Sequence, residues 1–430
     1  MDGISLFLVL LTVGMAPFVL ASTFGEIQKR VKELAIALLA LETAMIGVFV
    51  ALDLFLFYVF WEAMLIPMFL LIGVWGGERR RYAAIKFFLY TMAGSLLMLL
   101  AILVSYQQGE GTFSIPELTR RLPEVDQTRQ AILFFGFAIG FAIKVPMFPF
   151  HTWLPDAHVE APTAGSVVLA GVLLKMGTYG FVRFAIPFFP WAAHRYQGLM
   201  MGLAAVGIVY GALLALAQTD LKKLIAYSSI SHLGFVVLGL FSLTTLGITG
   251  GVFQMIGHGL STGALFLLVG VLYSRHHDRD LRSYGGLAKT APNFSALFFI
   301  ILLASIGLPG LVGFVGEFLI LNGAFRAGWI WGALGVSGVV LGAWYMLHAY
   351  RTIMHGPVAG RSGETEDLRP AEAAYLMPFV AAVILLGIFP RGMVSRIEPT
   401  VEAVVRQVER DRDRSPPSAP RVAQGEEIDR

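Results

Sequence analysis

Stretches of about twenty apolar residues recur along nearly the whole chain, and no other feature restricts its fold as strongly. A helix needs about 20 mostly apolar residues to cross the hydrocarbon core of a bilayer. Only 14% of the 430 residues are charged, against about 25% in soluble domains. Since helices and closed barrels alone satisfy all backbone hydrogen bonds in lipid, the sequence predicts an all-α integral membrane protein.

We expect about twelve transmembrane helices. Their approximate bounds are 4–22, 34–51, 54–75, 83–106, 130–147, 165–188, 197–217, 224–241, 247–273, 293–322, 328–350 and 372–390. The first stretch lacks the basic flank of a signal peptide, so we expect it to stay as a span. Residues 395–430 are polar and rich in charge. They are predicted to form a short surface helix followed by disorder.

The distribution of basic residues predicts the orientation. Cytoplasmic loops carry the excess of Lys and Arg in membrane proteins. Here the loops after odd-numbered spans hold sixteen of these residues and the loops after even-numbered spans hold five, leaving the tail aside. The sequence therefore predicts a multi-pass protein of the cell inner (plasma) membrane with both termini outside.

Spans two to six and spans seven to eleven form two successive blocks of five. Because each block has an odd number of spans, the two blocks have opposite orientations, as in an inverted repeat. The fourth span of each block pairs a proline break with an ionisable residue, Lys144 in one block and Glu317 in the other. Broken helices at matching positions are typical of a transport site. The predicted division is an N-terminal span (1–33), a first inverted repeat (34–190), a second inverted repeat (191–355), a C-terminal span (356–394) and a polar tail (395–430), with each repeat forming a half-channel.

Six ionisable residues fall inside six different spans, where an isolated charge costs roughly 2.5–3.5 kcal/mol. They are Glu62, Lys144, Lys175, His232, His258 and Glu317. Such residues face one another or water. A buried lysine beside a carboxylate exchanges protons readily, and histidine titrates near neutral pH, so the pattern predicts a buried proton pathway. We expect Glu62 and Lys144 to interact directly or through water. For each residue a structural ion pair or hydrogen bond remains the alternative, and for Glu42 the two interpretations are equally open.

Other kinds of chemistry have little support. The chain has no cysteine, so it cannot bind a thiolate-ligated iron–sulfur cluster. His151, Asp156, His158 and Glu160 are close in sequence, but their spacing fits no usual zinc motif. We therefore expect no cofactor and no metal in this chain, and no nucleic-acid partner.

Long and specific motifs lie between residues 149 and 318. They are PFHTWLPDAHVEAPT at 149–163, LLKMG at 173–177, QTDLKKLIAYS at 218–228, SHLGF at 231–235, HGL at 258–260, LPG at 308–310 and GEF at 316–318. Together they resemble the antiporter-like membrane subunits of complex I and of multisubunit Na+/H+ antiporters. The resemblance covers nearly the whole chain to about residue 390.

Within that family, the chain resembles the M-type (subunit 4) class. The stretch FWEAMLIPM at 60–68 is similar to that class. The carboxylate of Glu317 is similar to it as well, since the L and N classes and most antiporter subunits carry lysine at this position. The resemblance implies a proton channel with a glutamate and a lysine in the first block, a bridging lysine, a histidine in the second block and a terminal carboxylate. These roles fall on Glu62, Lys144, Lys175, His258 and Glu317, with His232 as an accessory relay.

The function implied by the resemblance is a proton-translocating membrane subunit of NADH–quinone oxidoreductase. This subunit is expected to be non-redox, to be driven by redox chemistry in partner subunits, and to lie between L- and N-type neighbours in the bilayer. The rivals are a subunit of a multisubunit cation/proton antiporter or membrane-bound hydrogenase, and an inert membrane scaffold. Members of the M class usually have fourteen spans, so we expect the start of the gene to lie upstream of Met1.

Overall fold

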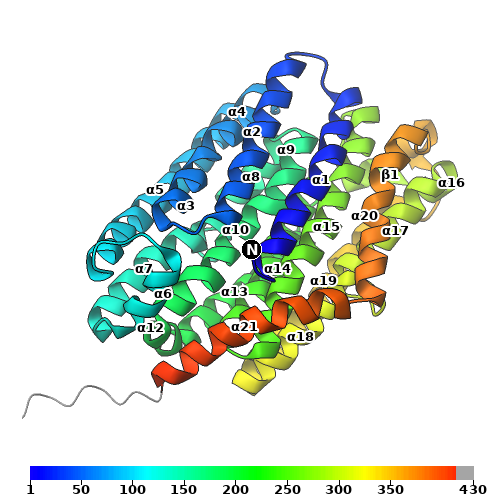
Figure 1. The fold of residues 1–430 in the computed structure, drawn as a ribbon. Coiled ribbons are helices and arrows are strands. Elements are labelled where there is room, and N and C mark those ends of the chain that lie inside the picture. The colour runs from blue at the N-terminus through cyan, green and yellow to red at the C-terminus, as the bar shows by residue number, and fades with distance from the viewer. Residues whose placement is uncertain (413–430) are drawn as a thin grey trace, which may run out of the picture.

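Ten long apolar helices dominate the structure, a computed structural model that describes residues 1–412 (Figure 1). Each is long and apolar enough to cross a membrane. They are α1 (Ser5–Glu26), α2 (Val31–Val50), α3 with α4 (Leu54–Ala63 and Leu65–Trp75), α5 (Arg80–Gln108), the continuous segment Thr163–Phe188, α13 (Gln197–Leu216), α14 (Leu221–Leu240), α15 (Thr245–His276), α19 (Trp329–Met354) and α20 (Pro370–Ile388). The predicted all-α membrane fold is confirmed.

Two broken helices account for the other two predicted spans. α7 (Gln127–Lys144) ends at Lys144, and the chain becomes helical again only in α8 (Trp153–Glu160). Likewise α17 (Pro292–Ser305) is separated from α18 (Val312–Ala327) by a non-helical link. In that link Gly307 has a φ of 75°, a left-handed conformation that glycine adopts at little cost. Both predicted breaks are therefore present, while the inverted relation of the two blocks and their boundaries stay predictions.

Three helical segments form the centre of the bundle. The most apolar window is entirely buried in Thr163–Phe188, 94% buried in α15 and 89% buried in α14. In α1 and α20 the same fraction is only 33% and 22%, so the outer helices present apolar side chains outward, as a lipid-facing surface requires. The polar groups of the central helices are thereby separated from lipid by a ring of apolar helices.

The central segment Thr163–Phe188 is not a uniform α-helix. It consists of α9 (Thr163–Val168), the π-helical η2 (Leu169–Leu173), α10 (Leu174–Gly180), the π-helical η3 (Phe181–Ala185) and α11 (Ile186–Phe188). π-Helical turns are rare and occur frequently at functional sites. The short α10 between them carries Lys175, which marks this turn for closer inspection.

Short elements connect the helices at the two ends of the bundle. They are α6 (Ile115–Arg121), η1 (Leu122–Glu124), α12 (Pro190–Arg195), η4 (Leu281–Ser283), β1 (Tyr284–Gly285), α16 (Leu287–Thr290), β2 (Ala359–Gly360) and η5 (Arg361–Glu364). β1 and β2 pair antiparallel, with Tyr284 opposite Gly360. This small sheet joins the loop after α15 to the loop after α19.

The side chain of Asp367, in the loop after α19, binds the first turn of α17. Its carboxylate accepts hydrogen bonds from the backbone N–H groups of Asn293 (3.0 Å) and Phe294 (2.9 Å) in the first turn of α17. Burial by itself raises the pKa of Asp367, but these N–H groups lower it, and the net pKa lies below the ordinary value of 3.8. The stabilisation is therefore present at neutral pH and is lost only as the pH falls through that lowered pKa.

We expect Asp367→Ala to lower the free energy of unfolding by about 0.5–2 kcal/mol, as the loss of a helix N-cap does. Thermal unfolding of the detergent-solubilised chain at neutral pH measures the change. Glu366→Ala is the matched control, since the Glu366 side chain is 73% exposed and surface changes usually stay within about 0.5 kcal/mol. Equal effects of the two substitutions would contradict the capping role.

An amphipathic helix, α21 (Arg391–Arg412), occupies the first part of the predicted polar tail. It runs across the bundle rather than along it (Figure 1). One face is buried, through Met393, Ile397, Val401, Val404, Val405 and Val408. Near its end Gln407 Nε2 donates to the carbonyl oxygens of Thr119 (2.7 Å) and Pro187 (2.8 Å). Residues 413–430, for which disorder was predicted, lie outside the described residues.

Candidate functional site

Lys144 is a buried cation at the end of α7, with 1% of its surface exposed. Its Nζ has no hydrogen-bond partner in the described structure and lies 5.3 Å from the centre of the Trp61 ring and 5.7 Å from that of Phe87. These aromatic faces give some stabilisation to a desolvated ammonium group. They do not replace a counter-charge, because a buried ion needs a charged or strongly polar partner.

Glu62 supplies the opposite charge. It lies in α3, three residues before α4 begins, and its charge acts on Lys144. None of the ion pairs shorter than 4.0 Å in residues 1–412 joins the two side chains, so they interact without direct contact. Glu62 Oε1 is also buried without a hydrogen-bond partner. Two unsatisfied polar atoms of opposite charge fit a connection through water.

Lys175 and His258 form a direct hydrogen bond in the centre of the bundle. Lys175 Nζ lies 2.6 Å from His258 Nδ1 and also donates to the carbonyl oxygen of Ala170 in the π-helical turn η2. Lys175 is fully buried and His258 is 2% exposed. Because an ammonium group only donates, Nδ1 of His258 is the acceptor while the lysine is charged. The bond therefore joins a proton donor to a proton acceptor that can exchange roles.

His232 continues this arrangement from His258 to Glu317. The two imidazole rings have centroids 5.6 Å apart and planes inclined at 57°. On the other side, His232 Nδ1 lies 3.5 Å from Oε1 of Glu317 in α18. We refer to Lys175, His258, His232 and Glu317 as the central relay. All four residues are buried, at 5% exposure or less.

Three further polar side chains hold the central relay in place, and none was predicted. Gln254 Nε2 donates to Glu317 Oε1 (3.4 Å). Ser305 Oγ and Tyr345 OH lie 3.4 Å and 3.5 Å from His232 Nε2. Gln254 precedes His258 by four residues in an apolar helix, so the two share one face, and this spacing was a usable signal. Ser305 and Tyr345 reach His232 from other helices, and no local pattern marks them.

The six predicted residues therefore fall into two groups. Four form the central relay, and the other two form the separate Glu62–Lys144 pair. Within residues 1–412 no hydrogen bond or ion pair joins Lys144 to Lys175. Glu42, which the sequence left open, belongs to neither group and lines an apolar groove formed by α1, α2, α9 and η2.

The residues considered for a metal site are not brought together. Asp156 pairs with Lys86 at 2.8 Å, and Glu160 accepts the backbone N–H of Arg79 at 2.9 Å. His158 instead stacks on Phe266. In the part of the chain that the structure describes, no group of three or more His, Asp and Glu side chains has the arrangement of a metal site.

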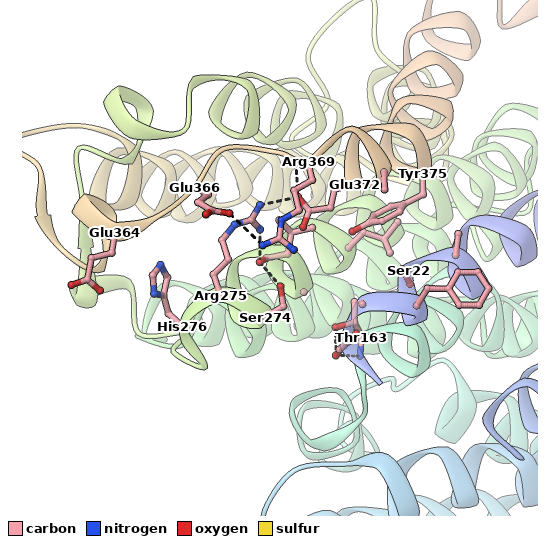
Figure 2. A pocket seen from close by; sticks show the side chains of 18 residues that line it. Ser22, Thr163, Ser274, Arg275, His276, Glu364, Glu366, Arg369, Glu372 and Tyr375 are labelled. Atoms are coloured by element: carbon pink, nitrogen blue, oxygen red, sulfur yellow. Dashed lines mark hydrogen bonds and ion pairs between the residues drawn. The ribbon is translucent and has the colours of Figure 1, made fainter. Parts of the chain in front are cut away.

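A cavity of about 680 Å³ opens where α1, α15 and α20 meet at one end of the bundle (Figure 2). Arg275 lies in its wall and pairs with Glu372 at 2.8 Å. A second cavity of about 730 Å³ lies beside it and is lined by Lys222 and Arg279. Both cavities include Glu26 and Thr163 in their walls. We call them the Arg275 cavity and the Lys222 cavity.

Comparison with known proteins identifies the family to which the chain belongs. Residues 51–342 match the family described as NADH:quinone oxidoreductase/Mrp antiporter, TM. The chain is 49% identical to NADH-quinone oxidoreductase subunit M of Rhodobacter capsulatus over 422 residues, which is 95% of this chain and 82% of that protein. A chain of respiratory complex I from Thermus thermophilus with bound NADH is 40% identical, with a TM-score of 0.87 over 95% of this chain and 85% of that one.

A more distant solved structure has the same fold as this chain but a much lower sequence identity. A chain of the Mrp complex from Dietzia sp. DQ12-45-1b superposes with a TM-score of 0.84 over 95% of this chain and 86% of that one, but at 22% identity. That likeness shows the fold alone. The far higher identity is to proteins named subunit M or chain 4. The chain therefore belongs to the NADH:quinone oxidoreductase/Mrp antiporter family and, within it, to the M-type (chain 4) subunits of complex I.

Proposed function

We propose that the chain translocates protons across its membrane as a non-redox subunit of NADH–quinone oxidoreductase. The observation that carries this proposal is the central relay, four titratable side chains in sequence through the buried middle of the bundle. Buried charges in membrane proteins are expensive and mark ion pathways. The 49% identity to a subunit M supports the assignment to this complex.

The proposed pathway moves a proton along the central relay in three transfers. Lys175 Nζ gives its proton to His258 Nδ1 across their hydrogen bond of 2.6 Å. His258 then releases the proton on Nε2, which has no protein partner in the described residues, through water to His232. His232 passes a proton from Nδ1 to Glu317 Oε1 over 3.5 Å. Each ring gains a proton on one nitrogen and loses one from the other, which leaves it in the opposite tautomer. The relay is back in its starting state once both rings have returned to their first tautomers, Glu317 has released its proton and Lys175 is protonated again.

The relatives support a setting for this activity. The structural relative from Thermus thermophilus is a chain of a respiratory complex I with bound NADH. We infer that this chain likewise works among other membrane subunits of such a complex, with L- and N-type neighbours, in the inner membrane and with both termini outside. Redox cofactors then belong to the partner subunits, because a chain without cysteine offers no thiolate for an iron–sulfur cluster.

The rival function is that of a cation/proton antiporter or membrane-bound hydrogenase subunit, which uses the same fold. The likeness to the Mrp complex, at 22% identity, supports only the fold. Purification of the chain from its native membrane separates the two. The proposal expects it to co-purify with NADH:quinone oxidoreductase activity, and co-purification with antiporter subunits without that activity would favour the rival.

Lys175→Met tests the proposal directly. Removing the donor of the first step should slow proton transfer through the relay on the order of 100-fold, as loss of a proton-transfer group does. The measurement is the ratio of translocated protons to electrons in vesicles that contain the assembled complex. Lys289→Met is the control, since Lys289 is an exposed lysine in α16. A normal ratio in a normally assembled Lys175→Met complex contradicts the proposal.

A further inference from the structure

Gly307 lies in the link between α17 and α18, beside the last member of the central relay. The first turn of α18 packs closely against the end of α17, because a Cβ atom at Gly313 would overlap the carbonyl oxygen of Ala304 and would lie 3.5 Å from Cα of Gly307. The side chains of a helix lean toward its N-terminus. The side chain of Glu317, in the second turn of α18, therefore leans back toward the link.

The Glu317 carboxylate occupies the space that a side chain at residue 307 would need. Its Oε1 faces the relay, 3.5 Å from His232 Nδ1 and 3.4 Å from Gln254 Nε2. Its Oε2 lies against Gly307, since a Cβ atom there would overlap Oε2 and would lie 3.3 Å from Cδ of Glu317. The carboxylate thus has relay side chains next to one oxygen and bare backbone next to the other.

Backbone conformation alone does not require a glycine at this position. Gly307 has a φ of 75°, which asparagine also tolerates. Every residue except glycine carries a Cβ atom, which would displace the carboxylate or the backbone.

Gly310 lies three residues further along the same link and has only the conformational requirement. Its φ is 91°. A Cβ atom at Gly310 would meet nothing within 4 Å beyond its own chain neighbours in the described part of the chain. The two glycines therefore separate the need for a left-handed backbone from the need for empty space beside Glu317.

A small displacement of the Glu317 carboxylate matters because its contacts are already long. Hydrogen bonds from N–H to oxygen usually measure 2.7–3.2 Å, and both separations at Oε1 exceed this range. The two oxygens are bonded to one carbon, so moving Oε2 away from residue 307 also moves Oε1 from its place beside His232 and Gln254. A misplacement of about 1 Å can slow a reaction step on the order of 100-fold.

We propose that Gly307 is a positioning residue for proton transfer, because its missing side chain leaves the space in which the Glu317 carboxylate is held within reach of His232. This inference rests on the proposed proton translocation. Gly307 exchanges no proton itself and acts only through the position of Glu317.

The test measures the proton-to-electron ratio and the subunit content in vesicles that contain the assembled complex. Gly307→Ala adds only the Cβ atom, and Gly307→Asn adds it in a residue that tolerates the left-handed backbone better. Gly310→Ala is the matched control, since it places an alanine at a left-handed position with open space. We expect both Gly307 variants to slow transfer through the relay about tenfold or more, which lowers the ratio, and Gly310→Ala to leave the ratio unchanged.

A double substitution shows whether the effect acts through Glu317. Aspartate is one methylene shorter than glutamate, so its carboxylate is drawn back from residue 307. We therefore expect Gly307→Ala combined with Glu317→Asp to have the same ratio as Glu317→Asp by itself, which keeps a titratable carboxylate and part of the transfer. A further loss in the double variant overturns the inference, since Gly307 then acts independently of the carboxylate.

Two more results would overturn it. If Gly310→Ala lowers the ratio as much as Gly307→Ala, the cause is strain in the link. If neither Gly307 variant assembles, the glycine is needed for folding. The Lys175→Met complex is measured alongside. If Lys175→Met lowers the ratio while both Gly307 variants keep it, this inference alone fails, and if Lys175→Met keeps it too, the proposed function fails.

Discussion

Replacing Glu62 by alanine is expected to abolish most proton translocation by the assembled complex, whereas Glu62→Asp retains part of it. Lys144 Nζ has no hydrogen-bond partner among the described residues, and the charge that acts on it is that of Glu62. Without the carboxylate, Lys144 is a lone buried cation and favours its neutral state. Aspartate keeps the charge at a longer distance, so the interaction weakens without disappearing.

The proton-to-electron ratio and the subunit content of the same Glu62→Ala membranes measure this effect. Glu78→Ala is the matched control, because Glu78 is an exposed glutamate in the loop after α4. Full translocation by a Glu62→Ala complex with normal subunit content would mean that the Glu62–Lys144 pair is structural.

Glu317→Gln is expected to lower the proton-to-electron ratio while the complex still assembles. Glutamine has nearly the same volume as glutamate, and its amide oxygen can still accept from Gln254 Nε2. It does not bind and release a proton, so the last step of the central relay stops. On the scale of other proton-transfer groups, the flux should fall on the order of 100-fold.

The alternative role for Glu317 is structural. In that role its carboxylate is a constant partner of His232 and holds α18 in place. In that case Glu317→Gln lowers the amount of assembled complex, and whatever forms translocates protons at the normal ratio. Measuring subunit content and ratio together separates the two roles. Glu402→Gln serves as the control, since Glu402 is an exposed glutamate in α21. A lowered yield with an unchanged ratio rejects the relay role of Glu317.

The helices were largely predictable because lipid requires long apolar runs and proline interrupts them. The breaks after Lys144 and before Glu317 follow directly from Pro146 and Pro309. The π-helical turns around Lys175 were not predictable. They depend on one extra residue per turn, chosen by packing against neighbouring helices, and no residue type marks them.

The buried ionisable residues could be picked out from the sequence, but their contacts with one another could not. Charged residues inside a span point to a pathway because each is costly alone. Which of them meet depends on helix rotation and depth, and these are set by tertiary packing. The sequence therefore could not reveal that Lys175 bonds His258 directly while Lys144 stays apart.

The transverse helix α21 has a mechanical consequence. It packs against α11 and α12 at one end of its course and against α15, and Gln407 ties it to the carbonyl oxygens of Thr119 and Pro187. It therefore acts as a cross-brace between the two predicted repeats. Many transporters work by rocking one repeat against the other, and a brace of this kind opposes such a movement. If the chain translocates protons as proposed, such a brace favours transfer between side chains over a large displacement of the repeats.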